Sequence, residues 1–284
     1  VAEILNRTKD QWKGKVKLVF QPAEENGGGG REMIKAGLMD EIPDACFALH
    51  VENGIPGKIV VGSRYLTAYS DSYKITVHGK AAHSSTPEEG VDAVYIAASI
   101  VTALHGIISR NISPMDRATL NVGMIHGGTA PNIIADEVTL GVMLRNLSKE
   151  SREAMMKKIE TISNGIAESM GGSCDLAFRA GYAAVYNDEK FSDFVAATFR
   201  KYEDIIHEDL GDGKPEDWLI TGEHPLLGAE DFGFYSQKAP SCMIWVGVGG
   251  NSPKHSPGFC IDERYIKLCT RAMAMTALEY LTKE

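Results

Sequence analysis

Residues 69–79 read YSDSYKITVHG, and this stretch decides the fold because its side chains alternate as in a strand with one exposed face. The pattern that follows predicts a long helix, two strands, a second helix and a closing strand; these cover residues 91–109, 117–125, 138–145, 149–170 and 173–180. Strand–helix–strand–strand–helix–strand is the order of a ferredoxin-like unit, a four-stranded antiparallel sheet with two helices on one face. We therefore expect residues 67–180 to form one domain.

The sequence on either side of this domain predicts a different architecture. Short apolar strands alternate with helices there, which is typical of a mostly parallel α/β sheet. The expected strands are 16–20 (VKLVF), 45–51 (ACFALHV), 58–61 (KIVV) and 242–249 (CMIWVGVG), and the expected helices are 31–39, 189–202, a short one near 231 and a last one from 262. Residues 1–66 and 181–284 are thus predicted to form an α/β domain into which the other domain is inserted.

Composition excludes several classes of function. Among 284 residues, Asp and Glu number 38 and Lys and Arg 29, so the net charge of −9 argues against a nucleic-acid partner. Apolar runs fall short of a membrane span, and no signal peptide is visible at the start, so we expect a cytoplasmic protein. The five cysteines include no CxxC pair, and a disulfide framework is not expected.

Four chemically capable side chains follow or end predicted strands. Glu24 and Glu25 come after strand 16–20, His50 lies near the end of strand 45–51, and His255 follows strand 242–249. Because parallel α/β sheets bind ligands at the carboxyl ends of their strands, these residues are expected to converge. Carboxylate and imidazole together suit zinc or manganese. Taken singly, each residue is weak evidence. His50 also fits a hydrogen-bonded histidine at a strand end, His255 an ordinary loop histidine, and Glu24 and Glu25 a solvated surface.

The four consecutive glycines 27–30 invite comparison with a phosphate-binding loop. The spacing argues against it, because Glu32 stands where the third glycine of G-x-G-x-x-G would fall and no Lys-Ser or Lys-Thr follows. Glu24 and Glu25 would also repel a phosphate. A nucleotide site is therefore not expected.

Six motifs in order resemble one known family over essentially the whole chain. They are VKLVFQPAEE, FALHV, GKAAHSSTPEEGVDA, GGTAPNIIADEVTLGVMLR, GAEDFGFY and HSPGF. The sequence resembles the dinuclear metal amidohydrolases and exopeptidases, which include bacterial aminoacylases, hippurate hydrolases, glutamate-releasing carboxypeptidases and plant indoleacetyl-amino-acid hydrolases. The resemblance implies a catalytic domain interrupted by a smaller lid, and hydrolysis of the amide bond of N-acyl amino acids or dipeptide-like substrates.

The resemblance also implies roles for individual residues. Glu24 is the implied general base; Glu25, His50 and His255 are implied ligands of two divalent metal ions, for which zinc and manganese fit best and cobalt and nickel also suit. In the lid, His83 is the implied oxyanion stabiliser, reaching in from a dimer partner. Asn132 and Arg145 are implied to hold the substrate, Arg145 through its fork-shaped grip on a carboxylate.

The chain departs from the family in one respect. The amidohydrolase branch draws its remaining ligands from a Cys-Gly-His-Asp motif, and none of the five cysteines here is followed by Gly-His. We expect that motif to precede Val1. If it is absent from the protein, a non-catalytic relative that binds acylated amino acids or peptides is the alternative.

A homodimer through the lid is expected on physical grounds as well. An antiparallel sheet in the lid should leave edge backbone groups that a second copy can pair with.

Overall fold

The computed structural model describes residues 1–210, 213–250 and 252–282, in two compact units. The first unit contains residues 1–66, 185–225 and 231–284 and the second contains residues 67–184 and 226–230. We call the second unit the lid.

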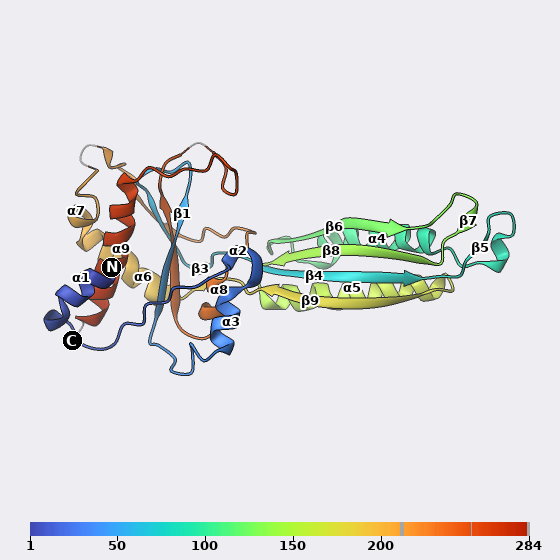
Figure 1. Cartoon of the computed structure of the whole chain (residues 1–284), viewed down its shortest axis with the longest axis horizontal. Helices are drawn as coiled ribbons and strands as arrows, with labels where there is room; N and C mark the ends of the chain where they lie inside the picture. Colours follow the sequence, from blue (N-terminus) through green and yellow to red (C-terminus); the bar gives the residue numbers. More distant parts are fainter. Residues whose placement is uncertain (211–212, 251, 283–284) are drawn as a thin grey trace. The chain divides into compact units, whose positions relative to one another are not determined.

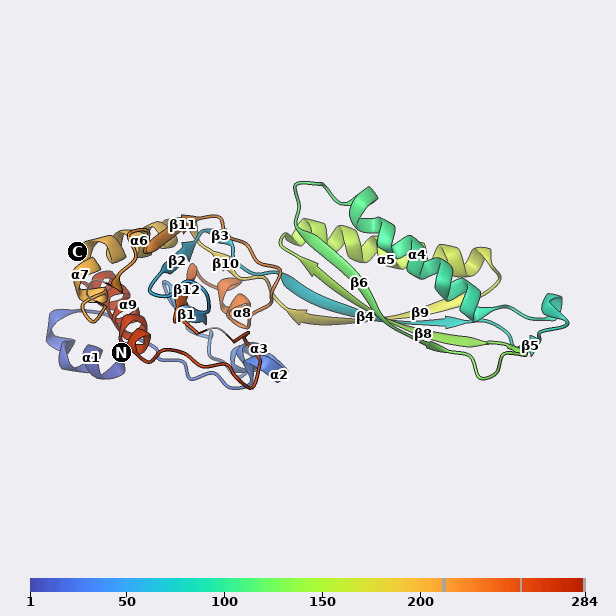
Figure 2. The same cartoon turned by 90° about the horizontal axis from the view of Figure 1, so that it is seen from above.

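The lid is an antiparallel sheet covered on one face by two helices (Figures 1 and 2). Its sheet has the strand order β6-β8-β4-β9, which is the ferredoxin-like order. The elements are β4 (Tyr69–His78), α4 (Ala93–Asn111), β6 (Ala118–Gly127), β8 (Glu137–Asn146), α5 (Lys149–Ser169) and β9 (Ser173–Tyr182). Each begins and ends within about two residues of its prediction from sequence.

Two short strands and one turn of helix complete the lid. Strands β5 (Ala82–His83) and β7 (Ile133–Ile134) pair antiparallel with each other, and the 3-10 turn η2 (Pro87–Glu89) follows β5.

Capping and apolar burial together account for the two lid helices. Asp92 accepts hydrogen bonds from the amides of Val94 and Tyr95 at 2.9 and 3.1 Å, and Ser148 caps α5 through the amide of Ser151 at 3.1 Å. Helix α4 is long and apolar enough to span a membrane by composition alone. One face of the helix packs on the sheet, with Ile96, Ile100, Leu104 and Ile107 at most 1% exposed, whereas Val94 and Tyr95 are exposed. The lid core therefore accounts for the apolar residues on the buried face of this helix.

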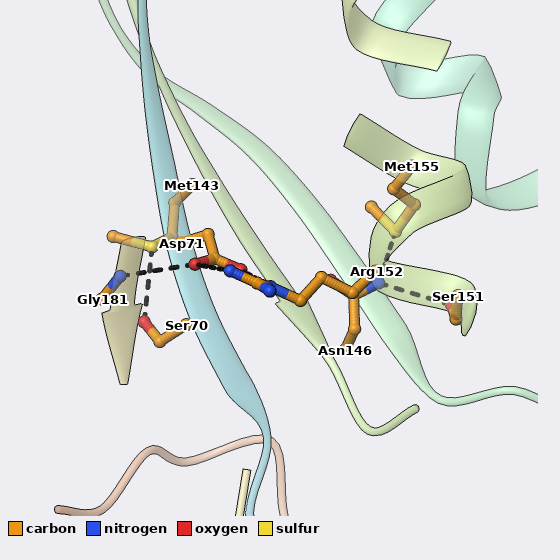
Figure 3. A network of polar contacts seen from close by, with 8 residues as sticks. All are labelled: Ser70, Asp71, Met143, Asn146, Ser151, Arg152, Met155 and Gly181. Atoms are coloured by element: carbon orange, nitrogen blue, oxygen red, sulfur yellow. Dashed lines mark hydrogen bonds and ion pairs between the residues drawn. The ribbon is translucent and has the colours of Figure 1, made fainter. Parts of the chain in front are cut away.

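One end of the lid is held by a partly buried ion pair (Figure 3). Arg152 donates from Nε and Nη2 to the two carboxylate oxygens of Asp71, at 2.6 and 2.9 Å. The amide of Gly181 donates to the same carboxylate at 3.3 Å, beside a bulge in the β4–β9 pairing at Ser70/Asp71. This group fixes the lid where strands β4 and β9 enter and leave it.

Residues 226–230 belong to the lid, whereas sequence analysis placed them, with 181–184, in the other domain. The amide of Ala68 donates to the carbonyl of Gly228 at 2.8 Å, and Arg145 donates to the carbonyl of Leu227 at 2.9 Å. These contacts join residues that are distant in sequence, which a local pattern does not reveal.

The first unit is a four-stranded sheet between two layers of helices, with strand order β1-β12-β2-β11. Strands β1 (Cys46–Glu52) and β12 (Ser241–Gly247) pair in parallel, as do β2 (Ile59–Gly62) and β11 (Leu219–Gly222), while β12 and β2 are antiparallel. Helices α6 (Glu189–Lys201) and α9 (Arg264–Leu281) pack on one face; α3 (Gly29–Lys35) and α8 (Phe232–Ser236) pack on the other. The α/β prediction is confirmed.

Short elements complete this unit. They are α1 (Ala2–Arg7), η1 (Lys9–Gln11), α2 (Glu24–Gly27), α7 (Glu203–Ile206) and the paired strands β3 (Arg64–Tyr65) and β10 (Tyr186–Asn187).

The predicted strand at 16–20 is wrong. These residues have no strand assignment, and Val16, Leu18 and Val19 are 38–44% exposed while Phe20 is 85% exposed. A strand requires a neighbour that accepts and donates ladder hydrogen bonds, and within the described residues β1 pairs with β12 alone. The apolar composition of the segment is typical of a strand, but no strand in the described part of the chain pairs with it.

Candidate active site

The loop that carries the two predicted glutamates has an unusual backbone. Helix α2 begins at Glu24, directly after Ala23, which has a left-handed conformation with φ of 56°. Among the described residues, only Ala23, Arg64 and His255 combine a side chain with a positive φ. Such conformations cost about 1–3 kcal/mol each and gather at functional sites. Of these three, His255 is itself a predicted metal ligand and Ala23 directly precedes the predicted base Glu24.

Close packing explains the glycine run in this loop. A Cβ atom on Gly29 would lie 1.7 Å from the carbonyl oxygen of Pro22, which no side chain can do. Gly28 has a φ of 66°, where glycine is favoured. The glycines therefore allow the chain to fold back on residues 21–22 immediately around Glu24 and Glu25.

A buried carboxylate lies beneath this loop. Asp231 is fully buried, and its Oδ2 accepts hydrogen bonds from Gln21 Nε2 at 2.7 Å and from the amide of Gly30 at 2.9 Å. The Tyr235 hydroxyl donates to Gln21 Oε1 at 2.6 Å. Burial raises the pKa of Asp231, and the amide of Gly30 opposes that shift by stabilising the charged form.

Glu25 and His255 lie close together, although 230 positions separate them in sequence. Glu25 Oε1 is 3.4 Å from His255 Nδ1, and the two side chains are 65% and 70% exposed. His255 lies in the loop after β12 and has a φ of 63°. A carboxylate and an imidazole that converge at an open surface form a donor pair suited to a divalent metal.

His50 lies on β1 in register with Trp245 of β12, and the two rings meet edge to face at 5.0 Å. His50 Nδ1 is 2.7 Å from the carbonyl oxygen of Val51. Since a carbonyl only accepts, Nδ1 carries the proton and Nε2 keeps its lone pair, as a metal ligand requires. By strand alternation His50 shares the face of Ala48, which packs against the cluster containing α8 residues.

Within the described residues, no group of three or more His, Cys, Asp or Glu side chains is arranged to hold a metal. The structure thus brings Glu25 and His255 together but does not place His50 in a three-ligand cluster with them. We expected Glu25, His50 and His255 to meet around a metal, and of these three Glu25 and His255 are adjacent.

His83 and Asn132 lie side by side in the lid. His83 pairs with Ile133 across the β5–β7 ladder, and the amide of Ser84 donates to the Asn132 carbonyl at 3.0 Å. The amide of Ser85 donates to His83 Nδ1 at 3.2 Å, so the neutral ring carries its proton on Nε2. The exposed His83 therefore presents an N–H donor, as an oxyanion stabiliser must.

Arg145 lies at the opposite end of the lid sheet. It pairs with Ser70 at the start of β4, whereas Glu137, at the other end of β8, pairs with His78. Eight residue steps separate positions 137 and 145, or roughly 26 Å at about 3.3 Å per step. One small substrate cannot reach both Arg145 and the His83–Asn132 pair of the same lid.

Comparisons with known proteins agree with this architecture. Residues 68–170 match the peptidase dimerisation domain. The chain is 31% identical to thermostable carboxypeptidase 2 of Saccharolobus solfataricus, over 99% of this chain and 70% of that protein. The chain belongs to the M20 peptidase family.

Two further M20 relatives are informative. The N-acetylcysteine deacetylase of Bacillus subtilis is 28% identical over 98% of this chain and 69% of its own length. The crystal structure of a dinuclear metal-binding peptidase of the M20 family from Bacillus subtilis superposes with a TM-score of 0.80 at 26% identity, over 99% of this chain and 69% of that one. Membership confirms the family resemblance and places the chain among hydrolases of amide bonds.

The chemistry of the donors fits the metal that this family implies. Glu25 and His255 already converge, and His50 has the tautomer of a ligand. Sequence reasoning missed the group formed by Gln21, Asp231 and Tyr235. The signal was available, because Asp231 and Tyr235 lie in the motif GAEDFGFY and Gln21 in VKLVFQPAEE.

Proposed function

We propose that this M20 protein hydrolyses the amide bond of N-acyl amino acids or dipeptide-like substrates. The observation that supports it most is that Glu25, next to Glu24, lies 3.4 Å from His255, which comes from a separate loop. Both segments are strained, because Ala23 and His255 have positive φ angles. A bound zinc or manganese pair, held by Glu25, His50 and His255, would polarise the amide carbonyl and activate water.

We assign Glu24 the role of general base. It is the first residue of α2, directly before Glu25, and it is half-buried. In this proposal Glu24 accepts a proton from the attacking water and delivers it to the leaving nitrogen. General bases of this kind contribute about 100- to 10,000-fold to the rate.

His83 and Asn132 are proposed to serve the active site of a second copy. They are too far from Arg145 in their own lid to share a small substrate with it. In a lid-mediated homodimer, Arg145 would grip the free carboxylate while the partner's lid supplies the oxyanion donor. Arg145 uses Nη1 for the Leu227 carbonyl, which leaves donors for a substrate.

The first experiment measures hydrolysis of N-acetyl amino acids and hippurate, with and without a chelator, followed by addition of zinc or manganese. Glu24→Gln should lower kcat at least about 100-fold while metal content persists. The control is Glu32→Gln, an exposed glutamate on α3 whose change should leave kcat unaltered. Unchanged turnover in the Glu24 variant would remove it from this role.

The second experiment mixes two inactive variants, Glu24→Gln and His83→Ala. If His83 acts in the partner's site, equal mixing restores about a quarter of the wild-type rate, because half of the dimers are mixed and each has one intact site. No recovery in dimers that have exchanged subunits would contradict the proposed contribution across the interface.

The alternative is a protein that binds acylated amino acids without cleaving them. The absence of a three-donor group from the described residues favours it. Calorimetric binding of N-acetyl amino acids without turnover, at any metal concentration, would support this alternative and contradict hydrolysis. A cytoplasmic location stays a prediction.

A further inference from the structure

The loop that carries Glu24 and Glu25 is held at both ends by one buried carboxylate. Asp231 Oδ2 accepts from Gln21, three positions before Glu24, and from the amide of Gly30, five positions after Glu25. The same oxygen therefore closes the segment 21–30 into a fixed span.

A second residue fixes the direction of the first contact. The Tyr235 hydroxyl donates to Gln21 Oε1 at 2.6 Å, so the amide nitrogen of Gln21 must face Asp231. Helix α8, which begins at Phe232, thus supplies Tyr235 to the group and follows directly on Asp231.

We propose that Asp231 is a positioning residue that sets the place of Glu24 by holding the loop on both sides. The proposal rests on the proposed function, in which Glu24 is the general base. Asp231 is fully buried and acts only through the loop. Hydrogen bonds to a buried charged acceptor are stronger than those between neutral groups, which suits a contact that must hold a strained backbone.

The test compares Asp231→Ala and Asp231→Asn with Asn187→Ala in the full chain. Asn187 is equally buried in the same unit, but it bonds to the backbone of Gly62 and Met243 and does not touch the loop. Hydrogen exchange followed by mass spectrometry measures protection of peptides that cover residues 21–30.

In Asp231→Ala, protection of this segment should fall about tenfold or more relative to Asn187→Ala, with a smaller fall in Asp231→Asn, which keeps one acceptor oxygen. The asparagine variant also keeps the test decisive if the alanine variant does not fold. Equal protection of residues 21–30 in the Asp231 variants and in Asn187→Ala would overturn the proposal.

The kcat and KM of the same variants supply a second test of the proposal. A displaced Glu24 should lower kcat by about 100-fold while KM changes little, and Asn187→Ala should not show this pattern. Loss of protection with unchanged kcat in the Asp231 variants would overturn the role in positioning Glu24. If the wild-type protein hydrolyses no N-acyl amino acid, the proposed function fails, and exchange alone still decides whether Asp231 holds the loop.

Discussion

Replacing Arg152 by methionine should destabilise the lid and leave the first unit unchanged. The Asp71 side chain is 1% exposed and that of Arg152 is 22% exposed, so the substitution leaves a carboxylate buried with one remaining amide donor. Breaking a buried ion pair on one side costs about 3–5 kcal/mol. Arg152 also lies 5.1 Å from the ring centroid of Tyr69, a contact worth about 0.5–1 kcal/mol.

Because Arg152 is partly solvated, we place the expected loss at the lower end, about 3 kcal/mol. With a urea m value of about 1.5 kcal/mol/M, the unfolding midpoint of the lid should fall by roughly 2 M. The matched control is Arg179→Met, an exposed arginine of the lid strand β9, which makes the same change in charge and should shift the midpoint little.

The distribution of tryptophan lets one titration separate the two units. All three tryptophans, Trp12, Trp218 and Trp245, lie in the first unit. Circular dichroism reports on both units, whereas tryptophan fluorescence reports on the first. We expect the Arg152 variant to shift part of the dichroism transition and leave the fluorescence transition in place. A shift no larger than that of Arg179→Met would refute the reasoning.

Three further predictions follow from burial and packing. Burial lowers the pKa of His207, so the unfolded chain binds more protons near pH 6, and the free energy of unfolding should fall as pH drops through about 6.5. In urea titrations at several pH values, His207→Gln should make the free energy of unfolding depend less steeply on pH. An unchanged pH dependence would contradict this. Iodoacetamide should label the exposed Cys260 in the folded protein and spare Cys242, which is fully buried and whose pKa is raised to about 12; mass spectrometry of labelled peptides checks this, and early labelling of Cys242 would count against it. Gly29→Ala places a methyl group against the Pro22 carbonyl and should cost at least about 2 kcal/mol in urea unfolding, whereas a neutral result would show that the loop relaxes freely.

The lid was predictable because its signals are local. Alternation along 69–79 and helical periodicity over 91–109 are properties of neighbouring residues, and the structure confirms β4 and α4. The segment 16–20 has the same apolar signal, yet a strand also needs a partner, which its own sequence cannot report. Residues 226–230 were misassigned for a related reason, since their contacts are with Ala68 and Arg145.

The candidate site divides in the same way. Glu25 and His255 do lie 3.4 Å apart, as the sequence predicted, but not for the reason given, because only His255 follows a strand, β12, and the strand expected before Glu25 is absent from the described residues. The rule that ligands gather at strand ends did not anticipate Asp231, because that residue is buried beneath the loop and contributes no group to the surface. The grip assigned to Arg145 and the roles of Glu24, His50, His83 and Asn132 stay predictions.

The way the chain enters and leaves the lid has a consequence for engineering. The amide of Leu66 donates to the carbonyl of Val185 at 2.9 Å, and Tyr65 pairs with Tyr186 just outside the lid. Residues 66 and 185 are thus already neighbours, so a tight turn could bridge them at small loop-closure entropy if residues 67–184 were excised. Residues 226–230 would then lose their contacts with Ala68 and Arg145 and would need a polar replacement. A foreign domain whose termini lie close together could be inserted between residues 66 and 185 in the same way, so this site suits domain-insertion experiments.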